Sequence, residues 1–118
     1  MHVVYVAGPY TAKASYLVEK NIDIAKELAM DVWKMGAVAL CPHLNSQHFE
    51  GCASSQAFID GTLELMRRCD SVLVCPNWET SVGTKGEITE AIRLGLPVFY
   101  SLKDLSIYLA HLDVDDNL

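Results

Sequence analysis

The chain has 118 residues, of which 51% are apolar, and its formal net charge is −6. This length predicts one domain spanning residues 1–118, and the apolar fraction is high enough to build a core. The acidic balance, together with the lack of a basic run in the sequence, argues against nucleic-acid binding. We also expect no membrane span, because no apolar run approaches the ~20 residues that one requires.

The N-terminus and the cysteines favour a cytoplasmic protein. No secretory segment precedes the first expected strand, since Met1 leads almost directly into the apolar residues 3–7. None of the four cysteines forms a Cys-x-x-Cys pair, which favours reduced thiols: Cys41, Cys52, Cys69 and Cys75. Two of them lie near His43 and His48, but the spacing matches no common zinc pattern, so we expect neither a metal nor a cofactor.

Short apolar runs alternate with helical patterns along the chain. We expect strands at residues 3–8, 37–42, 70–76 and 96–100, and helices from Ala12 or Ser15 to Met35, from Ser54 or Ser55 to Arg68, from the stretch after Ser81 to Gly95, and over residues 101–112. Residues 43–55 are expected to form an irregular polar loop, and residues 113–118 a loose acidic tail. The alternation predicts an α/β fold with a parallel sheet of four to five strands.

Ligands of such sheets bind beyond the carboxyl ends of the strands, so the loops there hold the candidate site residues. In the first loop, Gly8 permits close approach to a ligand and Pro9 stiffens the bend, although an ordinary strand-to-helix turn explains both. Tyr5 and Tyr10 bracket this turn, and each is either an aromatic residue of the core or rim or a source of a hydroxyl group near the expected cleft. His43 follows the second strand, where contact with a ligand is a better interpretation than a metal.

The stretch that begins at Ser81 has two interpretations. Thr84 followed three residues later by Glu87 fits a capping box, in which both side chains bond to N–H groups at the start of a helix. That cap does not require Ser81, Gly83 or Gly86. These three residues favour a close backbone approach at a helix N-terminus, where unpaired N–H groups attract anions. The residues alone leave both interpretations open.

Three motifs, in this order, resemble the nucleoside 2-deoxyribosyltransferase family. They are "YVAGPY" on the first strand, an acidic helix leading into "RRCDSVLV", and "SVGTKGEITEA" followed by "GLPVF". The chain is most similar to a compact, uncharacterised branch near the 2′-deoxynucleoside 5′-phosphate N-hydrolases. This resemblance implies a flavodoxin-like (Rossmann-like) three-layer sandwich. It also implies a homodimer or higher homo-oligomer in which a neighbour helps to complete each site.

The resemblance implies roles for individual residues. Glu87 closes the family's Gly-x-x-x-Glu motif, which starts at Gly83, and would be the nucleophile. It would attack the anomeric carbon of a nucleoside or nucleotide, expel the base and form a glycosyl ester that passes to another base or to water. Tyr5 would orient this glutamate. The family's acid that handles the base falls on Thr62 here, so Asp60, two residues earlier, is the candidate replacement.

Ser81 implies a phosphorylated substrate. Transferases of free nucleosides tend to carry an aspartate at this position, whereas relatives that hydrolyse nucleoside 5′-monophosphates carry a serine that binds phosphate. Ser81, Gly83 and Thr84 would then surround the phosphate at the helix start. The predicted activity is N-glycosidic cleavage or deoxyribosyl transfer on a nucleoside 5′-monophosphate. The alternative is a module that binds a nucleotide, or a signal derived from one, without cleaving it.

Overall fold

The computed structural model describes residues 1–116 and, within the last helix, side chains up to Leu112. In chain order the elements are β1 (Val3–Ala7), α1 (Ser15–Lys34), β2 (Val38–Leu40), α2 (Pro42–Asn45), α3 (Ser55–Arg67), β3 (Ser71–Val74), the 3₁₀ turn η1 (Trp78–Thr80), α4 (Val82–Arg93), β4 (Val98–Phe99) and α5 (Leu102–Asp116). No helix in this part of the chain is long and apolar enough to cross a membrane.

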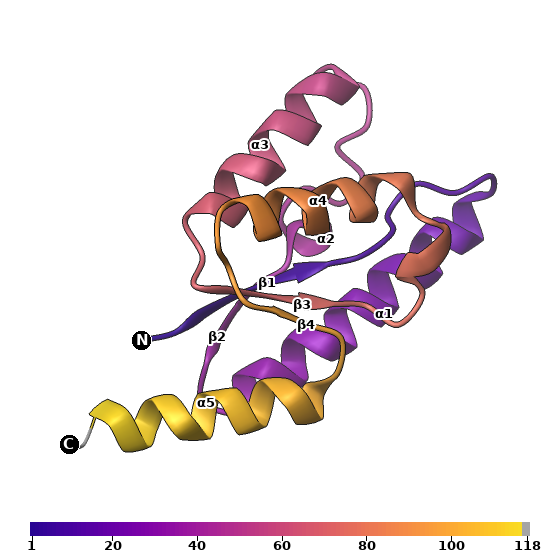
Figure 1. The fold of residues 1–118 in the computed structure, drawn as a ribbon. Helices are drawn as coiled ribbons and strands as arrows, with labels where there is room; N and C mark the ends of the chain where they lie inside the picture. The colour runs from indigo at the N-terminus through magenta and orange to yellow at the C-terminus, as the bar shows by residue number, and fades with distance from the viewer. Residues whose placement is uncertain (117–118) are drawn as a thin grey trace.

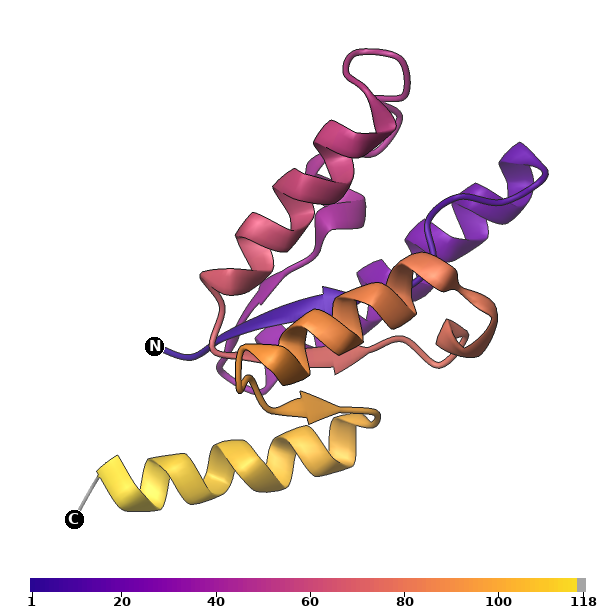
Figure 2. The same cartoon turned by 45° about the horizontal axis from the view of Figure 1, so that its top comes forward.

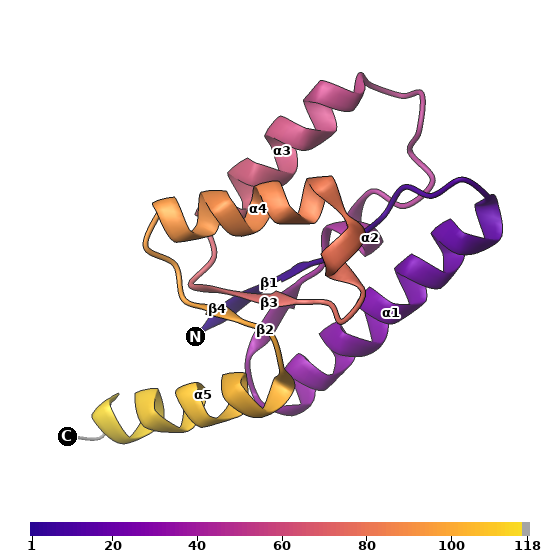
Figure 3. The same ribbon diagram turned by 45° about the vertical axis from the view of Figure 1, so that its right-hand side comes forward.

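The strands form one parallel sheet in the order β2-β1-β3-β4, which confirms the expected α/β fold with four strands. Helices α1 and α5 lie on one face of the sheet, and α3 and α4 lie on the other (Figures 1 and 3). Figure 2 shows β4 running between α4 and α5. The three layers place the two central strands, β1 and β3, in the interior.

Apart from Ser71 at the start of β3, the central strands consist of apolar and aromatic residues because both of their faces are covered by helices. Tyr5 and Ala7 of β1 point toward α3 and α4, where they pack with Met66 and Ile88. Successive strand residues point to opposite faces, and the residues between them pack on the other side with α1 and α5. That second group consists of Val4, Val6, Leu73, Cys75, Ala25, Ala29, Val32 and Leu105.

Two expectations about irregular segments are wrong. Residues 42–45 form the short helix α2 instead of starting a loop, and Pro42 occupies the first helical position, where its fixed φ angle suits a helix. Residues 113–116, expected in a loose tail, continue α5. Once the earlier turns of α5 are held by the core, each further residue adds to the helix at little cost. The rest of the expected tail, residues 117–118, lies outside the described residues.

Candidate active site

A cavity of about 390 Å³ opens beyond the carboxyl end of β1, between α2, α3, α4 and two loops. It brings together six of the residues singled out in the sequence: Tyr5, Gly8, Tyr10, His43, Gly83 and Glu87. Pro42, Phe58 and Ile59 add apolar surface to its walls. The position beyond the strand ends is the one expected for a ligand site in a parallel sheet.

Tyr5 and Glu87 form a hydrogen-bonded pair in this cavity. Tyr5 is fully buried on β1, and its hydroxyl donates to Glu87 Oε2 on α4. Burial raises the pKa of Glu87 to about 7, while the hydrogen bond from Tyr5 acts in the opposite direction. Burial and the nearby Glu87 charge raise the pKa of Tyr5 above its usual range. Glu87 thus has a carboxyl group that is fixed by the hydrogen bond from Tyr5 and titrates near neutral pH.

The capping-box interpretation of Thr84 and Glu87 is wrong. Helix α4 begins at Val82, and Ser81 is its N-cap, since Ser81 Oγ accepts from the backbone N–H of Thr84 at 3.1 Å. The Glu87 carboxylate bonds to Tyr5, as described above, and lies beyond the first turn. Glu87 is therefore not engaged in capping.

The start of α4 offers donors next to the cavity. The buried Thr84 hydroxyl donates to Ser81 Oγ at 2.8 Å. Because Ser81 Oγ accepts two hydrogen bonds, its own proton is directed away from both. Gly83 lines the cavity, and a Cβ added there would meet nothing within 4 Å. Ser81 and Thr84 do not line the cavity themselves but hold the turn that does.

The first loop is packed tightly against the end of β3. A Cβ added to Gly8 would lie 2.5 Å from Cys75 Sγ, so the packing of the protein itself requires glycine at this position. His43 Nε2 donates to the Pro9 carbonyl at 2.7 Å, and His43 Nδ1 is buried without a partner. Burial lowers the pKa of His43, which makes a neutral ring the stable form. Pro9 thus fixes His43 and does not itself line the cavity.

A second tyrosine–glutamate pair lies at the opening of the cavity, and sequence reasoning missed its carboxylate. Tyr10 donates to Glu50 Oε1 at 2.5 Å and accepts from the His48 backbone N–H at 2.8 Å. His48 has a φ of 63° and its ring contacts Glu19 Oε1 at 2.7 Å. These contacts join residues 46–54 to the loop after β1. The only sequence signal for Glu50 was its position in the polar loop after the second strand.

Asp60 does not join the other site residues. It is exposed on α3 and accepts from Gln56 Nε2 at 2.9 Å. The cavity is instead lined by Phe58, Ile59 and Thr62 of the same helix. At ~100° per residue, Asp60 and Thr62 point in directions about 160° apart. The structure therefore provides no carboxyl group at the position where the resemblance implied one.

The cysteines differ in exposure, and none is paired. Cys41, Cys69 and Cys75 are buried, and burial raises their pKa values, to about 11 for Cys69 and about 12 for Cys75. Cys52 is exposed in the 46–54 loop. Within the described residues, no group of three or more His, Cys, Asp or Glu side chains is placed to hold a metal ion.

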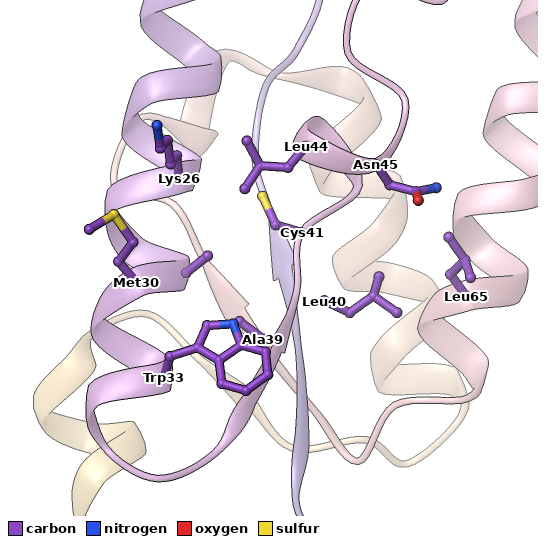
Figure 4. Close-up of a pocket in the computed structure, with 10 residues that line it drawn as sticks. Lys26, Met30, Trp33, Ala39, Leu40, Cys41, Leu44, Asn45 and Leu65 are labelled. Carbon is purple, nitrogen blue, oxygen red and sulfur yellow. The ribbon is translucent and has the colours of Figure 1, made fainter.

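A second cavity of about 460 Å³ lies at the β2 edge of the sheet, where α1, β2, α2 and α3 contribute lining residues. None of the predicted site residues lines it. Figure 4 shows Trp33 of α1 beside Ala39 of β2, with Leu65 of α3 on the opposite side. Trp33 is 57% exposed although it is a large aromatic residue. We call this apolar cavity the β2 groove.

Comparison with known proteins gives one family and a set of similar folds. The model of a family described as a domain of unknown function (DUF7768) matches residues 2–101. No curated protein sequence matches significantly. A solved 2-deoxyribosyltransferase from the psychrotolerant bacterium Bacillus psychrosaccharolyticus has a TM-score of 0.59 and 19% identity, over 81% of this chain and 69% of that chain.

A 2-deoxyribosyltransferase from Leishmania mexicana has a TM-score of 0.58 and 18% identity, over 83% of this chain and 62% of that chain. The match thus spans less than two thirds of the length of the Leishmania enzyme. These two structures confirm the flavodoxin-like fold.

Proposed function

The chain belongs to the family described as a domain of unknown function, DUF7768, and from its cavity we propose an N-glycosidase or deoxyribosyltransferase that acts on a nucleoside 5′-monophosphate. The observation that carries this proposal is the Tyr5–Glu87 pair within the cavity. Structures with a similar fold are 2-deoxyribosyltransferases, which supports the same class of reaction.

Glu87 acts as the nucleophile in this proposal. One carboxylate oxygen attacks C1′ of the sugar, the bond between C1′ and the base nitrogen breaks, and a glycosyl ester forms. A second base or a water molecule then attacks C1′ and releases Glu87. Tyr5 holds the carboxylate in one orientation and, through its hydrogen bond, favours the ionised form that attacks.

The 5′-phosphate lies at the start of α4 in this proposal. A helix N-terminus carries partial positive charge and N–H groups without helical partners, which suit a phosphate. The Ser81 hydroxyl has its proton free to donate, and Gly83 leaves space for close approach. Lys85, exposed on the first turn, adds a positive charge near this end.

We also infer that the chain forms a homodimer or larger assembly through helical surfaces. The β2 groove supports this, because Trp33, Met30 and Leu44 all line it and are all exposed. A contiguous apolar surface of this kind is typical of an interface. Light scattering at tens of micromolar checks the assembly, and Trp33→Lys is expected to shift it toward the monomer. A monomeric wild type would contradict the inference.

The catalytic proposal is tested by incubating the protein with matched nucleosides and 5′-monophosphates and measuring the release of free base. The wild type is expected to release base from monophosphates. The rate with Glu87→Gln is expected to be at least about a thousandfold lower, since the amide that replaces the carboxylate is a poor nucleophile. Glu27→Gln, a change at an exposed position of α1, makes the same charge change outside the cavity and serves as the control.

The binding module remains the second candidate because Asp60, the expected proton donor, lies outside the cavity. If the wild type binds monophosphates and releases base from none of the substrates tested, this candidate replaces the enzyme. If Glu87→Gln retains near-normal release, Glu87 is not the nucleophile.

A further inference from the structure

The leaving base presents a chemical problem in this cavity. A neutral base departs from C1′ with an electron pair and requires a proton from an acid. Six of the described lining residues carry a hydroxyl group, and two of these, Thr11 and Ser55, are exposed alcohols, which are too weakly acidic to protonate a base. The hydroxyl protons of the other four are already committed. Tyr5 donates to Glu87, Tyr10 to Glu50, Thr62 to the Ile59 carbonyl, and Ser46 to the Pro42 carbonyl.

The remaining titratable groups do not supply this proton either. His43 donates its Nε2 proton to the Pro9 carbonyl, and its other ring nitrogen carries a lone pair. The hydrogen bond from Tyr10 holds the pKa of Glu50 below its usual range, so Glu50 is ionised at neutral pH. Asp60 points away from the cavity.

The charge of the cavity favours a cation. Its described lining residues include two carboxyl groups, Glu50 and Glu87, and no lysine or arginine. The same walls carry Tyr10 and Phe58, whose aromatic faces attract cations and pack against flat rings. A flat, positively charged ring matches both properties of this surface.

We propose that the substrate is an N-glycoside whose base already carries a positive charge, such as a pyridinium ring, and that Glu50 is the residue that recognises this charge. The inference rests on the proposed function, because it concerns the leaving group of the same reaction. The positive charge of the base explains two features of the described cavity. It gives the exposed Glu50 carboxylate a partner, and it removes the need for an acid that protonates the leaving base.

The reaction balances without a proton donor. A Glu87 carboxylate oxygen forms a bond to C1′, and the bond between C1′ and the ring nitrogen breaks. The electron pair of that bond moves onto the nitrogen, neutralises its positive charge and leaves a neutral heterocycle. Water then attacks C1′ of the ester, Glu87 leaves as a carboxylate, and the proton lost by water passes to solvent.

The two charged ends of such a substrate fit opposite requirements. A 5′-phosphate suits the start of α4 at Ser81 and Gly83, whereas the cationic ring suits the wall that carries Glu50 and Tyr10. A nucleotide of this kind has one negative and one positive group. Nucleotides with an uncharged base provide the phosphate for the start of α4 but give Glu50 no positively charged ring to contact.

The test uses a matched pair of ligands, nicotinamide mononucleotide and its 1,4-dihydro form, which differ by one hydride and therefore in the charge of the ring. Binding is measured by calorimetry on Glu87→Gln, in which Glu50 is the one ionised carboxylate left in the described cavity wall. We expect the pyridinium form to bind about tenfold more tightly than the dihydro form. Adding Glu50→Gln should remove this preference, and adding Glu27→Gln should preserve it.

The outcomes separate this inference from the proposed function. Equal binding of the two forms, or a preference that persists in Glu50→Gln, overturns the charge assignment. If the wild type nevertheless releases the base from 5′-monophosphates whose base is uncharged, the proposed enzyme stands and only its substrate class changes. Release of nicotinamide by the wild type and none by Glu87→Gln, together with the binding preference, supports both.

Discussion

Two walls of the cavity each present a tyrosine hydroxyl that donates to a glutamate, but the two carboxyl groups differ in acid–base character. On the α4 wall, Tyr5 is fully buried and Glu87 partly buried, and burial raises the pKa of Glu87 to about 7. On the loop wall, Tyr10 and Glu50 are open to solvent, and the hydrogen bond lowers the pKa of Glu50. Two pairs of the same residue types thus differ in their carboxyl groups: Glu87 titrates near neutral pH, whereas Glu50 stays charged there.

The difference shows that surroundings decide the role of each pair. Desolvation penalises the charged form of Glu87, so this carboxyl group changes its protonation state near neutral pH. At the exposed Glu50, the hydrogen bond from Tyr10 is the largest effect and outweighs the desolvation that remains, so the pKa is lowered. A carboxyl group with a pKa of about 7 and a carboxylate with a lowered pKa therefore lie in one cavity and come from similar residue pairs.

The comparison predicts opposite effects on stability for the two glutamates. The folded pKa of Glu87 lies above its usual 4.5, so the protonated form stabilises the fold below about pH 4.5, and this contribution is lost as the pH rises to about 7. One pKa unit corresponds to about 1.4 kcal/mol, so the loss approaches about 3 kcal/mol. Glu87→Gln should therefore gain stability over the wild type between pH 5 and pH 8.

Urea unfolding at both pH values measures this effect. Glu50→Gln provides the contrast, because the pKa of Glu50 is lowered and its small contribution is present at high pH and lost on acidification. If Glu87→Gln shows no greater gain at pH 8 than at pH 5, the carboxyl group is not penalised by burial and the comparison between the walls fails.

Tyr5→Phe tests the hydrogen bond on the α4 wall. Because Tyr5 lowers the pKa of Glu87, its removal should raise this pKa further and leave less carboxylate at pH 7. We expect base release at pH 7 to fall about tenfold and to recover partly at higher pH. The pH dependence of kcat/KM measures the shift. An unchanged acidic limb would show that Tyr5 does not control the ionisation of Glu87.

Ser81→Asp tests the anion site at the start of the same wall. Aspartate is also a good N-cap, so the stability of α4 should change by less than about 0.5 kcal/mol. The new negative charge and the lost hydroxyl donor should weaken 5′-monophosphate binding about tenfold, while the matching nucleoside binds as before. Paired titrations measure both ligands. Equal wild-type affinity for nucleoside and monophosphate would end the phosphate assignment.

Tyr10→Phe should give the smallest effect. The pKa of Glu50 should rise toward its ordinary value because its hydrogen bond is lost, while the pKa of Glu87 stays the same. The His48 N–H also loses its acceptor, but exposure of the loop limits the loss of stability to about 1 kcal/mol. Carboxyl NMR titration reports both groups. A parallel shift of Glu87 would mean that the two walls are not independent.

The sheet and most helices could be predicted because local patterns specify them. Continuous apolar runs indicated the strands buried on both faces, and Ser54 was correctly identified as a possible cap, since it accepts from the Ala57 N–H at 3.1 Å. The position of His43 and Gly8 at the strand ends followed from the parallel topology, and both line the cavity.

The site was harder to predict where it depends on contacts between distant residues. The position of Glu50 depends on its hydrogen bond with Tyr10, 40 residues away, and on the backbone φ of 63° at His48. The choice between Asp60 and Thr62 depends on the rotation of α3 against the sheet. The first residue of α4 depends on the 3₁₀ turn η1, which is formed by residues 78–80. Because this turn ends at Thr80, the N-cap of α4 is Ser81 instead of Thr84.

The distribution of the four thiols makes the protein suitable for selective labelling. Cys41, Cys69 and Cys75 are enclosed and hold their protons, whereas Cys52 is in contact with solvent. A maleimide dye should therefore attach mainly at Cys52, two residues after Glu50 and without any engineered cysteine. Because Glu50 and Gly51 line the cavity, the fluorescence of this dye would report in real time when a molecule enters or leaves the cavity, even when no bond is broken.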